Sequence, residues 1–137
     1  MTFIASYQKE FDGFTYHAIN VGIELATIDG TTYVALDEMP ADVSPLLAVN
    51  ETAMTDELRA QIIAESPHTQ LIAQRMLDKI RERYSADKEA FYARIMGASS
   101  MGLYTLEEGE LDEIAAYSAW VESARTWQRE QRAELGL

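Results

Sequence analysis

The clearest hydrophobic pattern along the chain is that of an amphipathic helix over residues 66–84. Apolar residues recur there at spacings of three and four, which places them on one helical face, and charged residues occupy the opposite face. Pro67 suits the first helical position because its missing N–H is not needed there, and Ser66 before it can cap the helix. The apolar residues are Ala73, Met76, Leu77, Ile80 and Tyr84. This face predicts packing against another part of the protein or against a partner.

The same helical phase continues beyond Tyr84. It predicts one helix over residues 67–96, bent near Ser85 and ended by Gly97. The alternative is a separate helix over residues 86–96 with Ser85 as its cap. The residues that keep the phase are Ile80, Tyr84, Phe91 and Ile95. We expect the continuous helix.

Two further helices flank this segment. Thr55 can cap a short helix over residues 56–65, and Thr105 with Glu108 has the spacing of a capping box that opens a long C-terminal helix ending near Gly136. Its apolar side includes Ile114, Tyr117, Trp120, Val121, Ala124 and Trp127. Two helices of roughly thirty residues, each about 45 Å long, joined by a reversal over residues 97–102, predict an antiparallel helix hairpin.

Residues 1–38 have the pattern of β-strands. Runs rich in aromatic and β-branched residues cover residues 2–7, 14–21, 23–28 and 31–36. The pairs Asp12-Gly13 and Asp29-Gly30 separate these runs, and Asp-Gly favours the type I′ turn of a tight hairpin. If Asp29 and Gly30 form the turn, Ile28 lies opposite Thr31 and Ala26 opposite Tyr33. We therefore predict a small antiparallel sheet of three or four strands.

These elements predict an α+β protein with a single domain, which a length of 137 residues allows. We divide it into a β head at residues 1–38, a connector at residues 39–54 that contains Pro40 and Pro45, and a helical region at residues 55–137. A sheet this small needs cover from a helix or a partner.

The charge is strongly acidic and unevenly distributed. Eleven Lys and Arg against 23 Asp and Glu give a net charge of -12, which opposes binding to nucleic acid or to anionic membranes. Residues 66–105 are the exception, with 4 acids and 6 bases. These bases either pair with the acidic flanks of the same molecule or face an acidic partner. With no leader or membrane span in the sequence, we expect a soluble protein made in the cytoplasm.

Candidate catalytic and metal-binding groups are few. The chain has no cysteine, and its two histidines, His17 and His68, lack a partner at metal-ligand spacing. The acids of residues 107–113 are explained by the preference of a helix start for negative charge. The segment at residues 97–102 lacks the lysine of a phosphate-binding loop. We therefore expect no cofactor, no metal and no enzymatic activity.

The helix hairpin is longer than the small sheet needs, and it carries large aromatic side chains. This surplus predicts contacts outside the monomer, with aromatic anchors and with basic residues that orient the partner. The predicted partner-binding residues are Phe91, Tyr92, Tyr117, Trp120, Trp127, Arg75, Lys79 and Arg83.

Residues 56–137, above all residues 80–95 (IRERYSADKEAFYARI) and 115–137 (AAYSAWVESARTWQREQRAELGL), resemble the C-terminal halves of small phage tail proteins. The tail fibre assembly group is the most similar. The resemblance implies a chaperone for a bacteriophage tail fibre that acts in the host cytoplasm, in some cases staying bound in the virion tail. The Trp-Pro ending frequent in that group is absent here.

The leading hypothesis is therefore a phage tail accessory protein that binds a tail fibre or a neighbouring tail protein. A second hypothesis is a structural virion subunit that self-assembles into a homo-oligomer. A third is a small enzyme that uses the carboxylates of residues 107–113 with a divalent metal.

Overall fold

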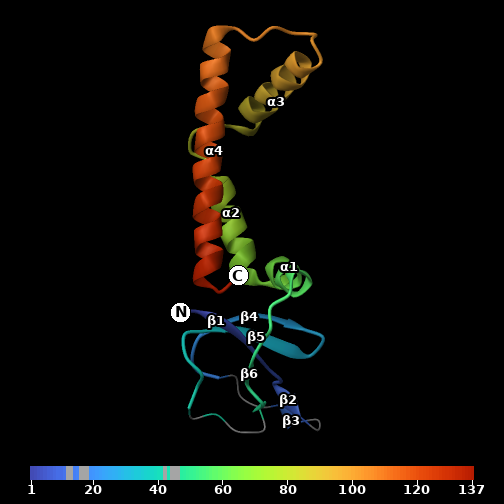
Figure 1. The fold of residues 1–137 in the computed structure, drawn as a ribbon, viewed down its shortest axis with the longest axis vertical. Helices are drawn as coiled ribbons and strands as arrows, with labels where there is room; N and C mark the ends of the chain where they lie inside the picture. The colour runs from blue at the N-terminus through green and yellow to red at the C-terminus, as the bar shows by residue number, and fades with distance from the viewer. Residues whose placement is uncertain (12–13, 16–18, 42, 44–46) are drawn as a thin grey trace. The chain divides into compact units, whose positions relative to one another are not determined.

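The computed structural model describes residues 1–11, 14–15, 19–41, 43 and 47–137, and it has the predicted α+β fold (Figure 1). Its contacts divide the chain into two units, Met1–Ile72 with Glu130–Leu137, and Ala73–Arg129. Each unit is described in turn. The elements are β1 (Phe3–Tyr7), β2 (Glu10–Phe11), β3 (Phe14–Thr15), β4 (Ile23–Ile28), β5 (Thr31–Leu36), β6 (Asn50–Glu51), α1 (Asp56–Glu65), α2 (Pro67–Arg81), α3 (Ala86–Ser100) and α4 (Glu108–Glu134).

The first unit contains a four-stranded antiparallel sheet in the order β4-β5-β1-β6. The β4–β5 hairpin turns at Asp29 and Gly30, whose φ angles of 49° and 80° are those of a type I′ turn. Ile28 lies opposite Thr31, and Ala26 lies opposite Tyr33. The predicted turn and register are therefore confirmed.

The fourth strand of this sheet does not come from the predicted place. It is β6, which lies within the segment predicted as a connector and pairs with β1. Of the strand predicted over residues 14–21, the described residues contain a strand at Phe14–Thr15, paired with β2 in a separate ribbon, and no strand at residues 19–21, while residues 16–18 lie outside the described part. The prediction for Asp12-Gly13 falls outside the described residues. A two-residue strand such as β6 has no alternation that a pattern could reveal.

The sheet is covered on both faces within the first unit. On one face, Ile62 of α1 and Leu135 near the C-terminus pack with Ile4, Leu25 and Ala35 of the strands. On the other face, a second cluster forms from the alternate positions, as the period of two in a strand requires. Its buried members are Ala5, Tyr7, Val34, Leu36 and Leu47. The small sheet is thus covered by residues of its own chain.

The corner between α1 and α2 is built around Thr69. Its buried hydroxyl lies 2.5 Å from the carbonyl oxygen of Ile63 at the end of α1 and 3.0 Å from that of Ser66, which also accepts a hydrogen bond from the Gln70 N–H. The hydroxyl of Ser66 is buried and has no hydrogen-bond partner among the described residues. Pro67 begins α2 as predicted, but Ser66 does not cap it with its side chain.

In the second unit, the predicted continuous helix over residues 67–96 is wrong. α2 ends at Arg81, and α3 begins at Ala86 with Ser85 as its cap, whose hydroxyl accepts a hydrogen bond from the Lys88 N–H at 3.1 Å. The N–H groups of Arg83 and Tyr84 both point to the carbonyl of Ile80, which closes α2 tightly. The alternative that was left open, a separate helix capped by Ser85, is the one observed.

The predicted ends on either side of the α3–α4 connection are also shifted. α3 passes through Gly97 and ends in a Schellman motif at Gly102, with φ of 74° and a 2.9 Å hydrogen bond from the Leu103 N–H to the Ala98 carbonyl. α4 starts at Glu108, and the carboxylate of Glu110 accepts from the Glu107 N–H at 3.1 Å. That bond is half of a capping box, two residues later than the predicted pair at Thr105 and Glu108.

Candidate functional site

An aromatic cluster joins the three helical segments of the second unit. Tyr84 follows α2, Tyr92 lies on α3 and Tyr117 on α4, with ring centroids 5.0 to 6.2 Å apart. The contacts of Tyr84 with the other two rings are edge-on, the arrangement that aromatic pairs prefer. Tyr92 is only 2% exposed. The Tyr92 ring thus packs against the other two tyrosines inside the unit.

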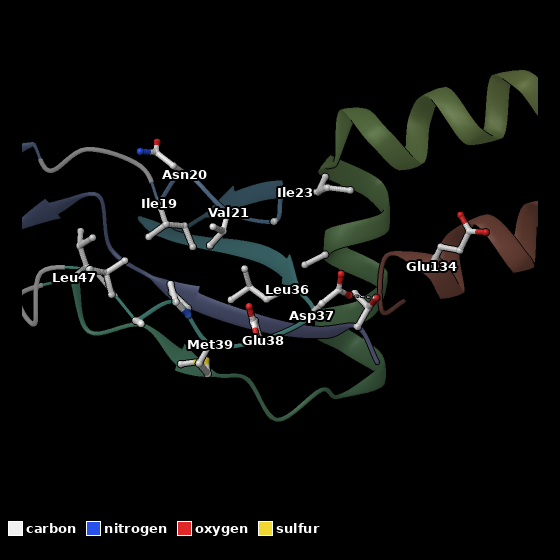
Figure 2. A pocket seen from close by; sticks show the side chains of 16 residues that line it. Ile19, Asn20, Val21, Ile23, Leu36, Asp37, Glu38, Met39, Leu47 and Glu134 are labelled. Atoms are coloured by element: carbon white, nitrogen blue, oxygen red, sulfur yellow. Dashed lines mark hydrogen bonds between the residues drawn. The ribbon is translucent and has the colours of Figure 1, made fainter.

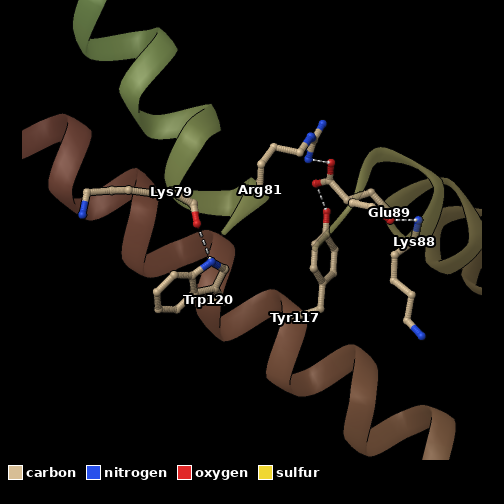
Figure 3. A network of polar contacts seen from close by, with 7 residues as sticks. Lys79, Arg81, Lys88, Glu89, Tyr117 and Trp120 are labelled. Atoms are coloured by element: carbon tan, nitrogen blue, oxygen red, sulfur yellow. Dashed lines mark hydrogen bonds and ion pairs between the residues drawn. The ribbon is translucent and has the colours of Figure 1, made fainter. Parts of the chain in front are cut away.

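A polar network secures the same cluster (Figure 3). The Tyr117 hydroxyl donates to the carboxylate of Glu89, which also forms an ion pair with Arg81. The hydrogen bond from Tyr117, followed by the effect of Arg81, lowers the pKa of Glu89. Burial, then the hydrogen bond to Glu89, raises the pKa of Tyr117 to about 12. The network holds α3 to α4 through one shared carboxylate.

The tryptophans of α4 pack against the end of α2 in a similar way. The indole N–H of Trp120 donates to the Lys79 carbonyl at 2.9 Å, one of the last α2 carbonyls without a partner in the helix (Figure 3). The Arg83 guanidinium lies 3.8 Å from the centre of the Trp120 ring, and the Lys79 ammonium lies 5.1 Å from that of Trp127. These distances are those of cation–π contacts.

These contacts change the role expected for the predicted residues. Tyr117, Trp120 and Trp127 are half-buried, and their nearest partners are on α2 and α3 of the same molecule. Lys79 and Arg83, predicted to orient a partner, lie over the tryptophan rings instead. The structure brings most of the predicted partner-binding residues together. They contact one another where the helices of the second unit pack.

Two of the predicted residues remain at the surface. Phe91 is 42% exposed on α3, and Arg75 is exposed on α2. The sequence alone could not separate Phe91 from its buried neighbour Tyr92, because the predicted continuous helix assigned the wrong phase to this segment.

The most exposed apolar side chains of the second unit lie outside the set of predicted partner-binding residues. Met101 is 72% exposed and Leu103 is 75% exposed, both at the C-terminal end of α3. Met96 on α3 and Leu111 in the first turns of α4 are also exposed. We call these four residues the α3–α4 apolar surface. The sequence predicts only a chain reversal at residues 97–102. The signal that could have indicated this surface is that Met101 and Leu103 are apolar residues in and directly after that reversal.

Acidic residues lie close in sequence to the members of this surface. Residues 96–113 contain five acids, Glu107, Glu108, Glu110, Asp112 and Glu113, and no Lys or Arg. Glu110 accepts a 2.6 Å hydrogen bond from the Tyr104 hydroxyl, which ties the connection to the start of α4. Glu113 accepts a 3.3 Å hydrogen bond from Tyr92. The hydrogen bond from Tyr104, the residue after Leu103, therefore places at least the Glu110 carboxylate beside the segment that carries the exposed Leu103.

A second candidate site is a pocket of about 880 Å³ in the first unit (Figure 2). Its wall is mostly apolar, and Gly22 is packed so closely that a Cβ atom there would lie 2.3 Å from the Ala35 carbonyl oxygen. The carboxylates of Asp37, Glu38 and Glu134 also line it, and Thr2 donates to Asp37 at 2.8 Å. Its apolar residues include Ile19, Val21, Leu36, Met39 and Leu47. Among the described lining residues, the pairing of Thr2 with Asp37 is a surface hydrogen bond with no third group to orient it, so the pocket offers space without a recognisable catalytic arrangement.

The described part of the chain contains no group of three or more His, Asp or Glu side chains arranged to hold a metal ion. His68 is exposed at the start of α2, and His17 lies outside the described residues. None of the helices in the described ranges is both long enough and apolar enough to cross a bilayer. No protein-family model, no curated protein and no solved structure matches this chain.

Proposed function

We propose that this protein is a non-enzymatic accessory protein of a phage tail that binds a tail fibre or a neighbouring tail protein. In this role it assists folding or assembly of its partner in the host cytoplasm, and it can stay bound in the finished tail. The observation that carries the binding role is the exposure of Met101 and Leu103. The phage tail context comes from the resemblance of residues 80–95 and 115–137 to tail fibre assembly proteins.

The energetic argument concerns the α3–α4 apolar surface. Fully burying one Leu or Met side chain contributes about 1.5–3 kcal/mol, so covering both Met101 and Leu103 supplies about 3–6 kcal/mol to association. The half-buried tryptophans offer less, because both rings and the Trp120 N–H already have partners in the same unit. Contact with another protein is therefore expected at the end of α3 and the start of α4.

The direct test is co-expression with the fibre protein encoded in the same phage genome. We expect the fibre to be more soluble, to form trimers and to co-purify with this protein. The double variant Met101→Ser with Leu103→Ser should lose these effects. The matched control Leu71→Ser with Leu77→Ser also removes two exposed leucines, but on α2, and should keep them.

Unchanged fibre solubility and trimer formation without this protein would overturn the chaperone role. The self-assembling virion subunit is separated by size-exclusion chromatography with light scattering on the isolated chain. A discrete ring formed without any other protein would support that alternative, and a monomer or dimer supports the binding protein.

A further inference from the structure

We infer that the partner presents a basic amphipathic segment to the α3–α4 apolar surface, with apolar side chains that cover Met101 and Leu103 and with Lys or Arg residues that face the acids around them. This inference rests on the proposed function, because it gives the chemistry of the partner at the same surface. It requires a surface held in a defined shape, free apolar area, and charge of one sign around that area.

The shape is defined by backbone hydrogen bonds. The Leu103 N–H donates to the Ala98 carbonyl at 2.9 Å, and the Gly102 N–H donates to the Ser99 carbonyl at 3.1 Å, so the end of α3 is closed by two bonds. The Tyr104 hydroxyl then binds Glu110 of α4 at 2.6 Å. Leu103 is therefore held at the surface by ordered backbone on both sides.

The apolar area is open and adaptable. Met101 is 72% exposed and Leu103 is 75% exposed, so both present apolar surface to water in the free protein. Covering that surface lowers the free energy. Met96 and Met101 add unbranched, polarisable side chains that adjust to the shape of a partner. Such side chains are suited to a peptide-like segment rather than to one rigid ligand.

Apolar contact alone would allow several kinds of partner at the α3–α4 apolar surface. The negative charge of residues 107–113 favours one of them. None of the acids at residues 107–113 forms an ion pair with Lys or Arg in the described structure. A second copy would bring the same five acids of residues 96–113 against each other, on a chain whose net charge is -12. Nucleic acid and anionic lipid are opposed for the same reason. Lys or Arg on the partner turns this repulsion into attraction.

The base nearest in sequence, Arg94, forms no ion pair with the acids of residues 107–113 in the described structure. Arg94 lies on α3, and its guanidinium donates to the carbonyl of Ala90 on the same helix at 3.3 Å. The acids at the start of α4 therefore remain available to cations supplied from outside.

The inference is tested by fluorescence anisotropy with the full chain and two labelled synthetic peptides. The probe is a Leu/Lys peptide with helical periodicity, and its control is the matching Leu/Glu peptide. We expect the Leu/Lys peptide to bind at least about tenfold more tightly than the Leu/Glu peptide. We expect its affinity to fall as salt is raised from about 0.05 M to about 0.5 M, because the charges are exposed.

Variants of the protein show whether the Leu/Lys peptide binds the α3–α4 apolar surface or is attracted only by the net negative charge of the protein. Met101→Ser with Leu103→Ser keeps every acid, and it should weaken the Leu/Lys peptide by at least about tenfold. Glu107→Gln with Asp112→Asn keeps the apolar side chains, and it should weaken binding and flatten the salt dependence. Leu71→Ser with Leu77→Ser is the control and should bind as the parent does. Far-UV circular dichroism checks that each variant is folded.

Three results would overturn the inference. One is equal binding of the basic and acidic peptides. The second is unchanged binding by the Met101→Ser, Leu103→Ser variant, which would mean attraction by net charge alone. The third is a dimer in light scattering that this variant abolishes, which would make a second copy the occupant. Fibre co-purification that survives any of these results leaves the proposed function intact.

Discussion

Replacing Tyr117 by phenylalanine tests whether the α3–α4 contact depends on the Glu89 network. The substitution keeps the ring against Tyr84 and Tyr92, and it removes only the hydroxyl that donates to Glu89. A pKa raised from 10.0 to about 12 corresponds to at most about 3 kcal/mol. Because Tyr117 is half-buried and Arg81 still pairs with Glu89, we reduce the expected loss to about 1 kcal/mol.

The assay is thermal unfolding followed by circular dichroism at neutral pH. A loss of about 1 kcal/mol should lower the midpoint by roughly 3–5 °C for a chain of this size. The matched control is Tyr104→Phe, which also removes a hydroxyl that donates to a glutamate, Glu110, but at an exposed position. It should leave the midpoint unchanged, because exposed pairs contribute little. Identical melting of wild type and Tyr117→Phe would refute the reasoning.

The stability difference between wild type and Tyr117→Phe should depend on pH, because folding shifts the pKa values of Tyr117 and Glu89. Folding raises the pKa of Tyr117, so its contribution is complete below about pH 10, the value in the unfolded chain, and is lost as the pH rises towards 12. Folding lowers the pKa of Glu89, so its contribution is complete above 4.5 and is lost as the pH falls below that value. The stability gap between wild type and Tyr117→Phe should therefore shrink at both ends. A gap that stays constant from pH 4 to pH 11 contradicts this account.

Three further substitutions test the fold. Ser85→Ala removes the cap of α3 and should cost about 1 kcal/mol in urea unfolding, and Ser85→Thr should restore most of it, since both hydroxyls can cap. Ile62→Ala empties a fully buried position and should cost about 2–5 kcal/mol, seen as a lower urea midpoint, with Ile62→Val costing about 1. Gly30→Ala meets no steric clash but places a Cβ at a φ of 80°, and should cost about 1–2 kcal/mol by thermal unfolding, whereas Asp29→Asn should be neutral.

The parts of the fold that the sequence predicts well are those with a local physical cause. The β4–β5 hairpin follows from Asp29-Gly30, because few other pairs accept positive φ at both positions. The cap at Thr55 follows from its position before α1, and its hydroxyl accepts from the Leu58 N–H at 3.2 Å. In both cases the deciding interactions lie within a few residues, so the pattern contains them.

The break between α2 and α3 was missed because two signals competed. The spacing of Ile80, Tyr84, Phe91 and Ile95 fits one helix, and Ser85 fits the start of another. Tertiary contacts decided it: Tyr92 is buried against Tyr84 and Tyr117, which turns the adjacent Phe91 outward. Which of two neighbouring aromatic residues is buried depends in part on Tyr117, which is 25 residues from Tyr92 in the sequence, and helical periodicity does not contain that information.

The packing of the predicted partner-binding residues could not be read from the sequence for a related reason. Large aromatic residues at helical spacing were assigned to a partner, although a helix pair can use them itself, with Lys79 and Arg83 over the tryptophan rings. The exposed methionine and leucine of the α3–α4 connection have no periodicity, and only the positions of the surrounding elements show that nothing in the unit covers them.

The corner between α1 and α2 contains a position at which a substitution should increase the stability of the fold. Thr69 donates to the Ile63 and Ser66 carbonyls there, whereas the buried hydroxyl of Ser66 has no hydrogen-bond partner among the described residues, and a lone buried hydroxyl costs about 1–3 kcal/mol. Ser66→Ala should therefore raise the thermal midpoint, whereas the same change at Ser85 lowers it. Natural chains need only be stable enough, and a protein engineer who wants a sturdier version of this one should begin at position 66.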